Sequence, residues 1–160
     1  MVWLATTGLA ISLCGAAVST LSFRFVVPCT PQSPTYTFIH HGEKQTLCVE
    51  DAAVLEGGDI TGVERLPGGN ILRLVLSKDG TRKFSHATAS NIGRRVAVVF
   101  GDRILQAPFI RGQTILTALR MKPEVDDATA AALIAAYPLK KTLRIFCVPL
   151  RSLNSSAKKI

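Results

Sequence analysis

The sequence predicts an α+β fold, with a mixed, mostly antiparallel sheet and two helices packed on one face of it. Short runs of β-branched and other apolar residues alternate with turns that contain Gly or Pro, a pattern typical of strands joined by hairpins. Two segments, one before Gly93 and one after Pro123, instead carry apolar residues at helical spacing. The predicted order is strands, helix, three strands, helix and strand, which places both helices on the same face.

Residues 1–24 are predicted to be a signal peptide or an N-terminal membrane anchor. No charged side chain occurs from residue 2 to residue 23, and Arg24 ends the run. About 20 apolar residues in a helix suffice to cross the ~30 Å hydrocarbon layer. Ala17 and Ser19 offer a small-x-small pair for cleavage, but no Lys or Arg precedes the apolar run, so both alternatives stay open. Either one predicts a domain that is periplasmic, or anchored to the inner membrane and exported.

Residues 25–34 include PCTPQSP and are predicted to be a Pro-rich linker, with the folded domain at 35–150. The domain is expected to open with short strands at 36–39 and 46–49, joined by a turn at His41-Gly42-Glu43.

Three cysteines lie beyond the leader, Cys29, Cys48 and Cys147. An oxidising compartment permits one disulfide among them and leaves an odd thiol. Cys29 and Cys48 could close an N-terminal loop, whereas Cys147 lies in an expected core strand and could serve as a small apolar residue.

The first helix is expected to follow a hairpin. A Pro-Gly-Gly turn separates strand-like residues 60–66 from residues 70–77. Ser77 or Asp79 can cap the helix that comes next, and Gly93 is a natural end for it.

A further hairpin is predicted after this helix. Residues 95–100 are rich in β-branched residues and continuously apolar from Val96, which favours a strand covered on both faces, and a Gly-Asp turn leads to a return strand at 103–110. Pro108 gives no amide hydrogen, so it should lie at a strand edge, a bulge or a strand end.

The C-terminal part should supply two strands and the second helix. A strand is expected at 115–121, and Pro123 with three acidic residues after it predicts the helix that Pro138 ends. A last strand at 142–150 and a basic polar tail at 151–160 complete the chain.

The segment TASNIGRRVAVVFGDRILQAPFI resembles the head subdomain of the first periplasmic loop of SecD, in the SecD/SecDF protein-export family. In that family a helix runs into Thr, Asn and Gly-Arg, a hydrophobic strand and an acidic turn follow, and the return strand ends in Ala-Pro-hydrophobic-Ile. The matching residues are Thr88, Asn91, Gly93, Arg94, residues 95–100, Gly101, Asp102, Ala107, Pro108 and Ile110. The resemblance covers residues 59–139 and implies a head-like module without the membrane motor, because the family's membrane helices, ferredoxin-like base and proton-relay residues have no counterpart here.

The formal net charge of +8 favours anionic partners. Nucleic acid is not expected, because the basic residues are not interleaved with aromatics that stack on bases, and aromatics make up only 6% of the chain. The remaining candidate anionic partners are lipid head groups, cell-wall polymers and acidic segments of other proteins.

No catalytic, cofactor or metal site is predicted. The chain lacks GxSxG, a phosphate-binding glycine loop and CxxC. His40 and His41 are adjacent on an expected strand and should point to opposite faces. Glu124, Asp126 and Asp127 are expected to cap the second helix.

The resemblance implies a surface that contacts emerging polypeptide, and the candidate partner-binding residues are Arg94, Arg95, Phe109, Ile110 and Arg111. The two arginines could equally satisfy the carbonyls at the end of the first helix. The first hypothesis is therefore an exported, non-enzymatic module that binds secretory polypeptide or a translocon component. The alternative is a basic envelope-binding domain that recognises anionic lipid or cell-wall polymer.

Overall fold

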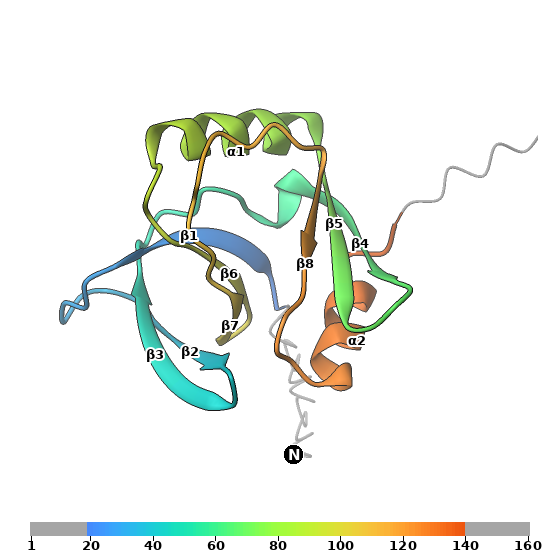
Figure 1. The fold of residues 1–160 in the computed structure, drawn as a ribbon, viewed down its shortest axis with the longest axis horizontal. Helices are drawn as coiled ribbons and strands as arrows, with labels where there is room; N and C mark the ends of the chain where they lie inside the picture. The colour runs from blue at the N-terminus through green and yellow to red at the C-terminus, as the bar shows by residue number, and fades with distance from the viewer. Residues whose placement is uncertain (1–18, 140–160) are drawn as a thin grey trace, which may run out of the picture.

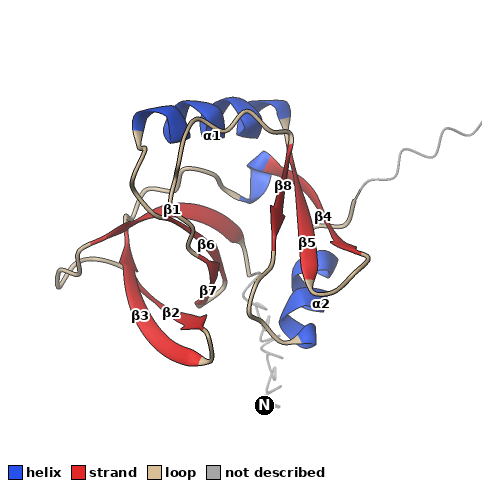
Figure 2. Cartoon of the chain, viewed as in Figure 1, coloured by secondary structure: helices blue, strands red, loops and turns tan. Residues whose placement is uncertain are grey.

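Two β-sheets and two helices make up residues 19–139, the part of the chain that the computed structural model describes (Figure 1). Five strands close into a barrel in the order β1 (Leu21–Val27), β3 (Glu43–Val49), β2 (Thr35–His40), β7 (Arg103–Gln106) and β6 (Val96–Phe100). Three more form a separate antiparallel sheet in the order β4 (Ile60–Leu66), β5 (Ile71–Leu76) and β8 (Ala118–Met121). The α+β class is as predicted, but the strands divide between two sheets (Figure 2).

The barrel begins within the segment predicted to be leader and linker. β1 pairs antiparallel with β6 from Leu21 opposite Phe100 to Phe25 opposite Val96. Leu21, Phe23 and Phe25 alternate with Ser22 and Arg24, and all three apolar side chains are buried. This alternation is that of a strand with one face in the core. The expected start of the domain at residue 35 is therefore wrong for β1, which belongs to the fold.

The remaining local predictions are largely confirmed. β4 and β5 form the hairpin around the Pro-Gly-Gly turn, in which Gly68 and Gly69 have φ of 96° and 131°. β2 and β3 form the first hairpin, and β6 pairs antiparallel with β7. The expected strand at 115–121 is shorter, since β8 covers only its second half. The strand predicted at 142–150 and the tail at 151–160 lie outside the described residues.

Both helices start where capping chemistry predicts. α1 (Lys78–Ser90) has Ser77 as its N-cap, whose side chain accepts from the backbone N–H of Gly80 at 2.9 Å. α2 (Asp127–Ala136) has Asp126 as its N-cap, which accepts from the Thr129 N–H at 2.9 Å. A single-turn 3₁₀ helix, η1 (Gly57–Asp59), precedes β4.

The larger core lies between the two sheets and under α1. It joins side chains from the barrel strands β1 and β6, from β4, β5 and β8, and from both helices. Phe23 meets Phe84 of α1 edge to face, with ring centroids 5.7 Å apart. A smaller cluster fills the barrel and includes Phe38, Val49 and Val99. One disulfide, Cys29–Cys48, ties the loop after β1 to β3, and the two Cα atoms are 5.1 Å apart. It is the pair that the sequence suggested could close the N-terminal loop.

Among residues 19–139, no helix combines the length and the apolar character needed to cross a membrane.

Candidate functional site

Arg94 is held by contacts inside the domain. Its guanidinium forms an ion pair with Glu50 and donates to Asn91 Oδ1 at 2.9 Å. It also lies 4.3 Å from the centre of the Phe25 ring, within cation–π range. Asn91 is the C-cap residue of α1. Arg94 therefore ties the end of α1 to β1 and to the loop after β3. Its side chain does so through Asn91 Oδ1 and Glu50, not through the carbonyls at the end of the helix as the simpler prediction had it.

Arg95 instead positions an exposed aromatic ring. Its Nε donates to the carbonyl oxygen of Ala107 at 3.0 Å, and its guanidinium lies 5.4 Å from the Phe109 ring centre and 5.9 Å from that of Phe38. The Phe109 side chain is 63% exposed. Arg95 thereby fixes an apolar side chain at the protein surface.

The chain after β7 runs alongside residues 93–96. Gly93 N–H donates to the carbonyl oxygen of Ile110, Ile110 N–H donates to that of Arg94, each at 2.8 Å, and Val96 N–H donates to that of Pro108 at 3.0 Å. Pro108 takes part only through its carbonyl, at the end of the strand region, as its missing N–H predicts. Ile110 is buried, so of the predicted contact residues it faces the core, whereas Phe109 and Arg111 are exposed.

Residues 108–111 form one wall of an apolar pocket of about 430 Å³. The segment 108–114 closes it on one side, and Gln113 and Thr114 attach that segment to Ser85 and Thr88 of α1 by hydrogen bonds of 2.9 Å. Figure 1 shows the chain between β7 and β8 rising from the barrel to α1 and then descending to β8. The remaining walls come from β1, β5, β6, β8 and α1, through Phe23, Leu74, Phe84, Val96, Val98, Leu119 and Met121. The volume is in the range of small-molecule sites in proteins.

The polar groups that line this pocket include two arginines and a glutamine. Arg111 and Arg120 both line it, and no acidic side chain is among its lining residues in the described part of the chain. Gln106 also lines it, and its Oε1 is buried and accepts no hydrogen bond from any described residue. A buried acceptor without a partner is uncommon in native proteins. The pocket therefore offers an apolar interior and a positive edge.

The acidic groups whose pKa values are shifted, Asp59 and Asp126, lie outside this pocket and have structural roles. Burial alone would raise the pKa of Asp59, but hydrogen bonds from Lys83 and from the Glu56 backbone N–H hold that pKa below its usual range. Lys83 Nζ lies 2.9 Å and 3.1 Å from the two carboxylate oxygens. The hydrogen bonds from Thr129 lower the pKa of Asp126, the N-cap of α2. Both shifts follow from capping or pairing, as expected for the acidic group that starts α2.

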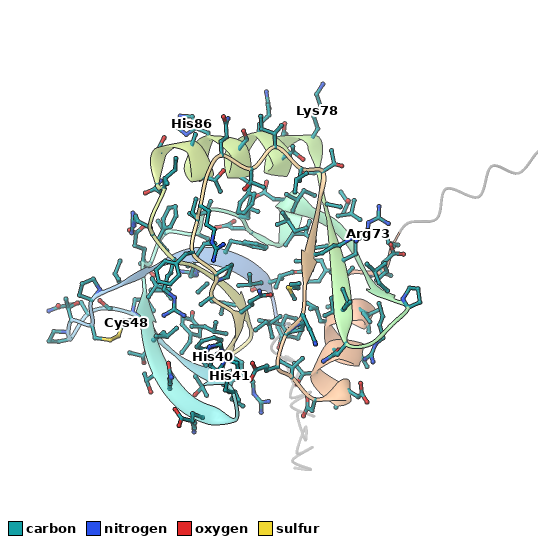
Figure 3. All side chains as sticks on the ribbon, viewed as in Figure 1. His40, His41, Cys48, Arg73, Lys78 and His86 are labelled. Carbon is teal, nitrogen blue, oxygen red and sulfur yellow. A yellow bond between two sulfur atoms is a disulfide. The ribbon has the colours of Figure 1, made fainter. Side chains whose placement is uncertain are left out.

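Glu124 does not cap α2. Its Oε2 accepts from the backbone N–H of His41 at 2.6 Å, and its Oε1 lies 3.7 Å from His40 Nδ1. His40 and His41 do not point to opposite faces, because His41 has left the strand with φ of 51°, and the two ring centroids are 4.1 Å apart. Figure 3 shows both histidines at the end of β2.

Sequence reasoning missed Gln106 and Arg120. Gln106 ends β7 and Arg120 lies in β8, and the two strands belong to different sheets. No local pattern marks either residue, so only the packing of the sheets brings them to the same pocket.

Comparison with known proteins identifies the family. A family model described as the SecDF P1 head subdomain matches residues 33–136, which is more than half of the chain. The chain belongs to the SecDF P1 head family. The match extends further toward the N-terminus than the resemblance at residues 59–139 indicated.

Relatives of this P1 head domain are much longer proteins. The protein translocase subunit SecDF of Thermus thermophilus is 30% identical over 102 residues, covering 58% of this chain and 14% of the relative. A solved structure of SecDF, described as a membrane component that enhances protein export, superposes with a TM-score of 0.55 at 19% identity and covers 74% of this chain and 61% of that one. A SecDF structure in a super-membrane-facing form gives the same TM-score and identity over 75% of this chain and 18% of that one. The two structures support the fold.

Proposed function

We propose that this SecDF P1 head domain works in protein export as a non-enzymatic module that binds extended polypeptide outside the cytoplasm. The observation that carries the proposal is the apolar pocket beneath residues 108–114, with Phe109 at its mouth. The pocket would bind a segment of a polypeptide without catalysing a reaction on it.

The pocket suits a large apolar side chain of an unfolded protein. Its volume and its lining of Phe, Leu, Val and Met side chains favour burial of apolar surface at about 25 cal/mol per Å². Arg111 and Arg120 favour segments that carry acidic residues beside the apolar one.

The alternative, an anionic envelope surface, rests on the net charge of +8. Many cationic side chains of residues 19–139 are paired, including Arg24, Arg65, Arg73, Arg82, Lys83, Arg94 and Arg103. The net charge already counts these acidic partners, and among residues 19–139 Lys and Arg exceed Asp and Glu by only two, so the described domain presents little excess positive charge to a lipid or cell-wall polymer.

Binding of a labelled, permanently unfolded polypeptide by fluorescence anisotropy tests the proposal. Phe109→Ser should weaken binding about tenfold, equal to about 1.4 kcal/mol. Ile92→Ser is the matched control, because Ile92 is 61% exposed, close to Phe109, and does not line the pocket. Equal affinity for both variants would reject the pocket as the site.

Vesicles of phosphatidylcholine with and without phosphatidylglycerol test the alternative in the same assay. Binding to the anionic vesicles that falls steeply with added salt, together with no binding of polypeptide, would favour the envelope-binding function. Crosslinking in the native cell envelope with a photoreactive group at residue 109 separates secretory polypeptide from a translocon component as the partner.

Export itself is supported by the Cys29–Cys48 disulfide, since disulfides persist in oxidising compartments. A reporter that is active only in the periplasm, fused after residue 139, should be active. Activity from a reporter that works only in the cytoplasm would rule out an exported location for the domain. It would therefore also rule out a role in binding secretory polypeptide outside the cytoplasm.

A further inference from the structure

A cluster of two histidines and one glutamate lies at the tip of the β2–β3 hairpin, apart from the pocket. His40 is the last residue of β2 and His41 the first residue of the turn. His41 and Gly42 have φ of 51° and 79°, positive at both central positions as a tight two-residue hairpin requires. The positive φ moves the His41 side chain out of the strand alternation and brings its ring beside that of His40. The turn therefore presents two imidazoles together.

Glu124 reaches this tip from the segment between β8 and α2. Its two oxygens are used differently: Oε2 accepts from the His41 N–H at 2.6 Å, and Oε1 lies 3.7 Å from His40 Nδ1. One atom from each of the three side chains, a ring nitrogen of each histidine and a carboxylate oxygen, lies within 4.8 Å of the others. The backbone hydrogen bond sets the orientation of the carboxylate, as partners behind the ligands do in established metal sites.

We propose that His40, His41 and Glu124 bind a zinc ion. Zinc takes imidazole nitrogen at about 2.0–2.1 Å and carboxylate oxygen at about 2.0–2.2 Å in tetrahedral sites, so neighbouring ligand atoms lie about 3.4 Å apart. The 3.7 Å between His40 Nδ1 and Glu124 Oε1 is close to that spacing. The remaining separations close by rotation of exposed side chains, and three protein ligands leave a fourth position for water.

Two features prepare this site for an ion. The His40 ring stacks on Phe38, with centroids 5.5 Å apart and planes at 14°, which limits the orientations of the imidazole. All three ligands are exposed, so an ion entering the site keeps part of its hydration. Arg103 borders the same groove as Glu124 and opposes a cation, which limits the affinity of the site.

The position of the site gives the ion a structural effect. His40 and His41 belong to the barrel, whereas Glu124 belongs to the segment that leads from the second sheet into α2. A bound zinc ion joins these two parts of the domain at a point where, without it, the contact depends on the Glu124 carboxylate. A bound zinc ion therefore links the barrel to the α2 side of the domain. This link does not depend on whether the pocket binds polypeptide.

Isothermal titration of the full chain with Zn²⁺ tests the site, after EDTA treatment and dialysis and with any free thiol capped by iodoacetamide. Glu124→Gln keeps an acceptor for the His41 N–H but replaces the carboxylate. It should weaken zinc binding about tenfold or more, because changing a residue that only orients a metal ligand already weakens binding by about tenfold. His41→Gln should do the same. His86→Gln is the matched control, because His86 lies on the outer side of α1 and is not part of the cluster, and it should bind as the parent does.

Hydrogen exchange, at a zinc concentration that saturates the parent, supplies a second measurement that locates where the ion acts. Zinc should slow exchange at residues 40–43 and 122–126 in the parent and in His86→Gln, and not in Glu124→Gln. Equal zinc affinity for the parent, Glu124→Gln and His41→Gln would overturn the proposal, as would protection that persists in Glu124→Gln.

Discussion

Phe23→Ala tests whether β1 is a core strand of the domain. The Phe23 side chain is 3% exposed and packs edge to face on Phe84. Removing a buried Phe ring costs about 3–5 kcal/mol, and about 0.5–1.5 kcal/mol of that is the aromatic pair. At about 2 kcal/mol per M of urea, a loss of about 4 kcal/mol lowers the unfolding midpoint by about 2 M. Urea melts of the oxidised chain, followed by far-UV circular dichroism, measure the change.

Phe109→Ala is the control, since it removes the same ring from a side chain that is 63% exposed. It should cost about 1 kcal/mol or less, because only the contact with Arg95 and a little burial are lost. If residues 1–24 were instead a leader that packs against nothing, Phe23→Ala would be neutral. Equal midpoints for the two variants would therefore refute the assignment of β1 to the core.

Three further results are expected. Val98→Asp should destabilise the domain by several kcal/mol, because it places a carboxylate in a strand with all five residues buried; an unchanged urea midpoint would contradict this. Cys29→Ser should cost about 3 kcal/mol, given the 19-residue separation from Cys48, and reduction of the parent should lower its midpoint by the same amount. Because the folded-state pKa of Asp59 is depressed, its contribution is present above the unfolded value of 3.8 and is lost as pH falls through the lower native pKa. Acid titration of Asp59→Asn should show a smaller loss in that window than the parent, and an identical acid limb would exclude the pairing with Lys83 as its cause.

Local chemistry is sufficient to predict the turns and helix ends. The Pro-Gly-Gly turn, the Ser77 cap and the pairing of β6 with β7 all depend on neighbours in the sequence. Each is specified by positive φ at glycine, by a capping side chain or by a β-branched run. These features are therefore predictable from residues alone.

The division into two sheets is not predictable in this way. It depends on which strands pair across long separations, such as β1 with β6 and β5 with β8. The length and apolarity of residues 2–23 conceal β1, although Leu21, Phe23 and Phe25 alternate with polar residues as a half-buried strand does. That alternation is the available signal for the strand.

The structure separates the predicted contact residues by their exposure and contacts. Phe109 and Arg111 lie at the pocket, but Ile110 is buried and Arg94 is engaged with Glu50. Strand alternation explains the difference, because neighbours along an extended segment face opposite ways. The histidine cluster escapes prediction because one left-handed residue changes the direction of a side chain. The available signal is that His is enriched at positive φ, and here it precedes a turn glycine.

The position of β1 in the barrel bears on how the protein is handled. β6 is completely buried and has β1 on one side and β7 on the other. A shortened protein that starts at Thr35 would lack β1 and expose the edge of β6, an apolar strand without charge. Such an edge pairs readily with the same edge of another molecule, and the short uncharged run Val-Ala-Val-Val-Phe has the composition of segments that stack into fibrils. Truncation at that point should therefore yield insoluble aggregates, and the seven residues of β1 protect the barrel from self-association.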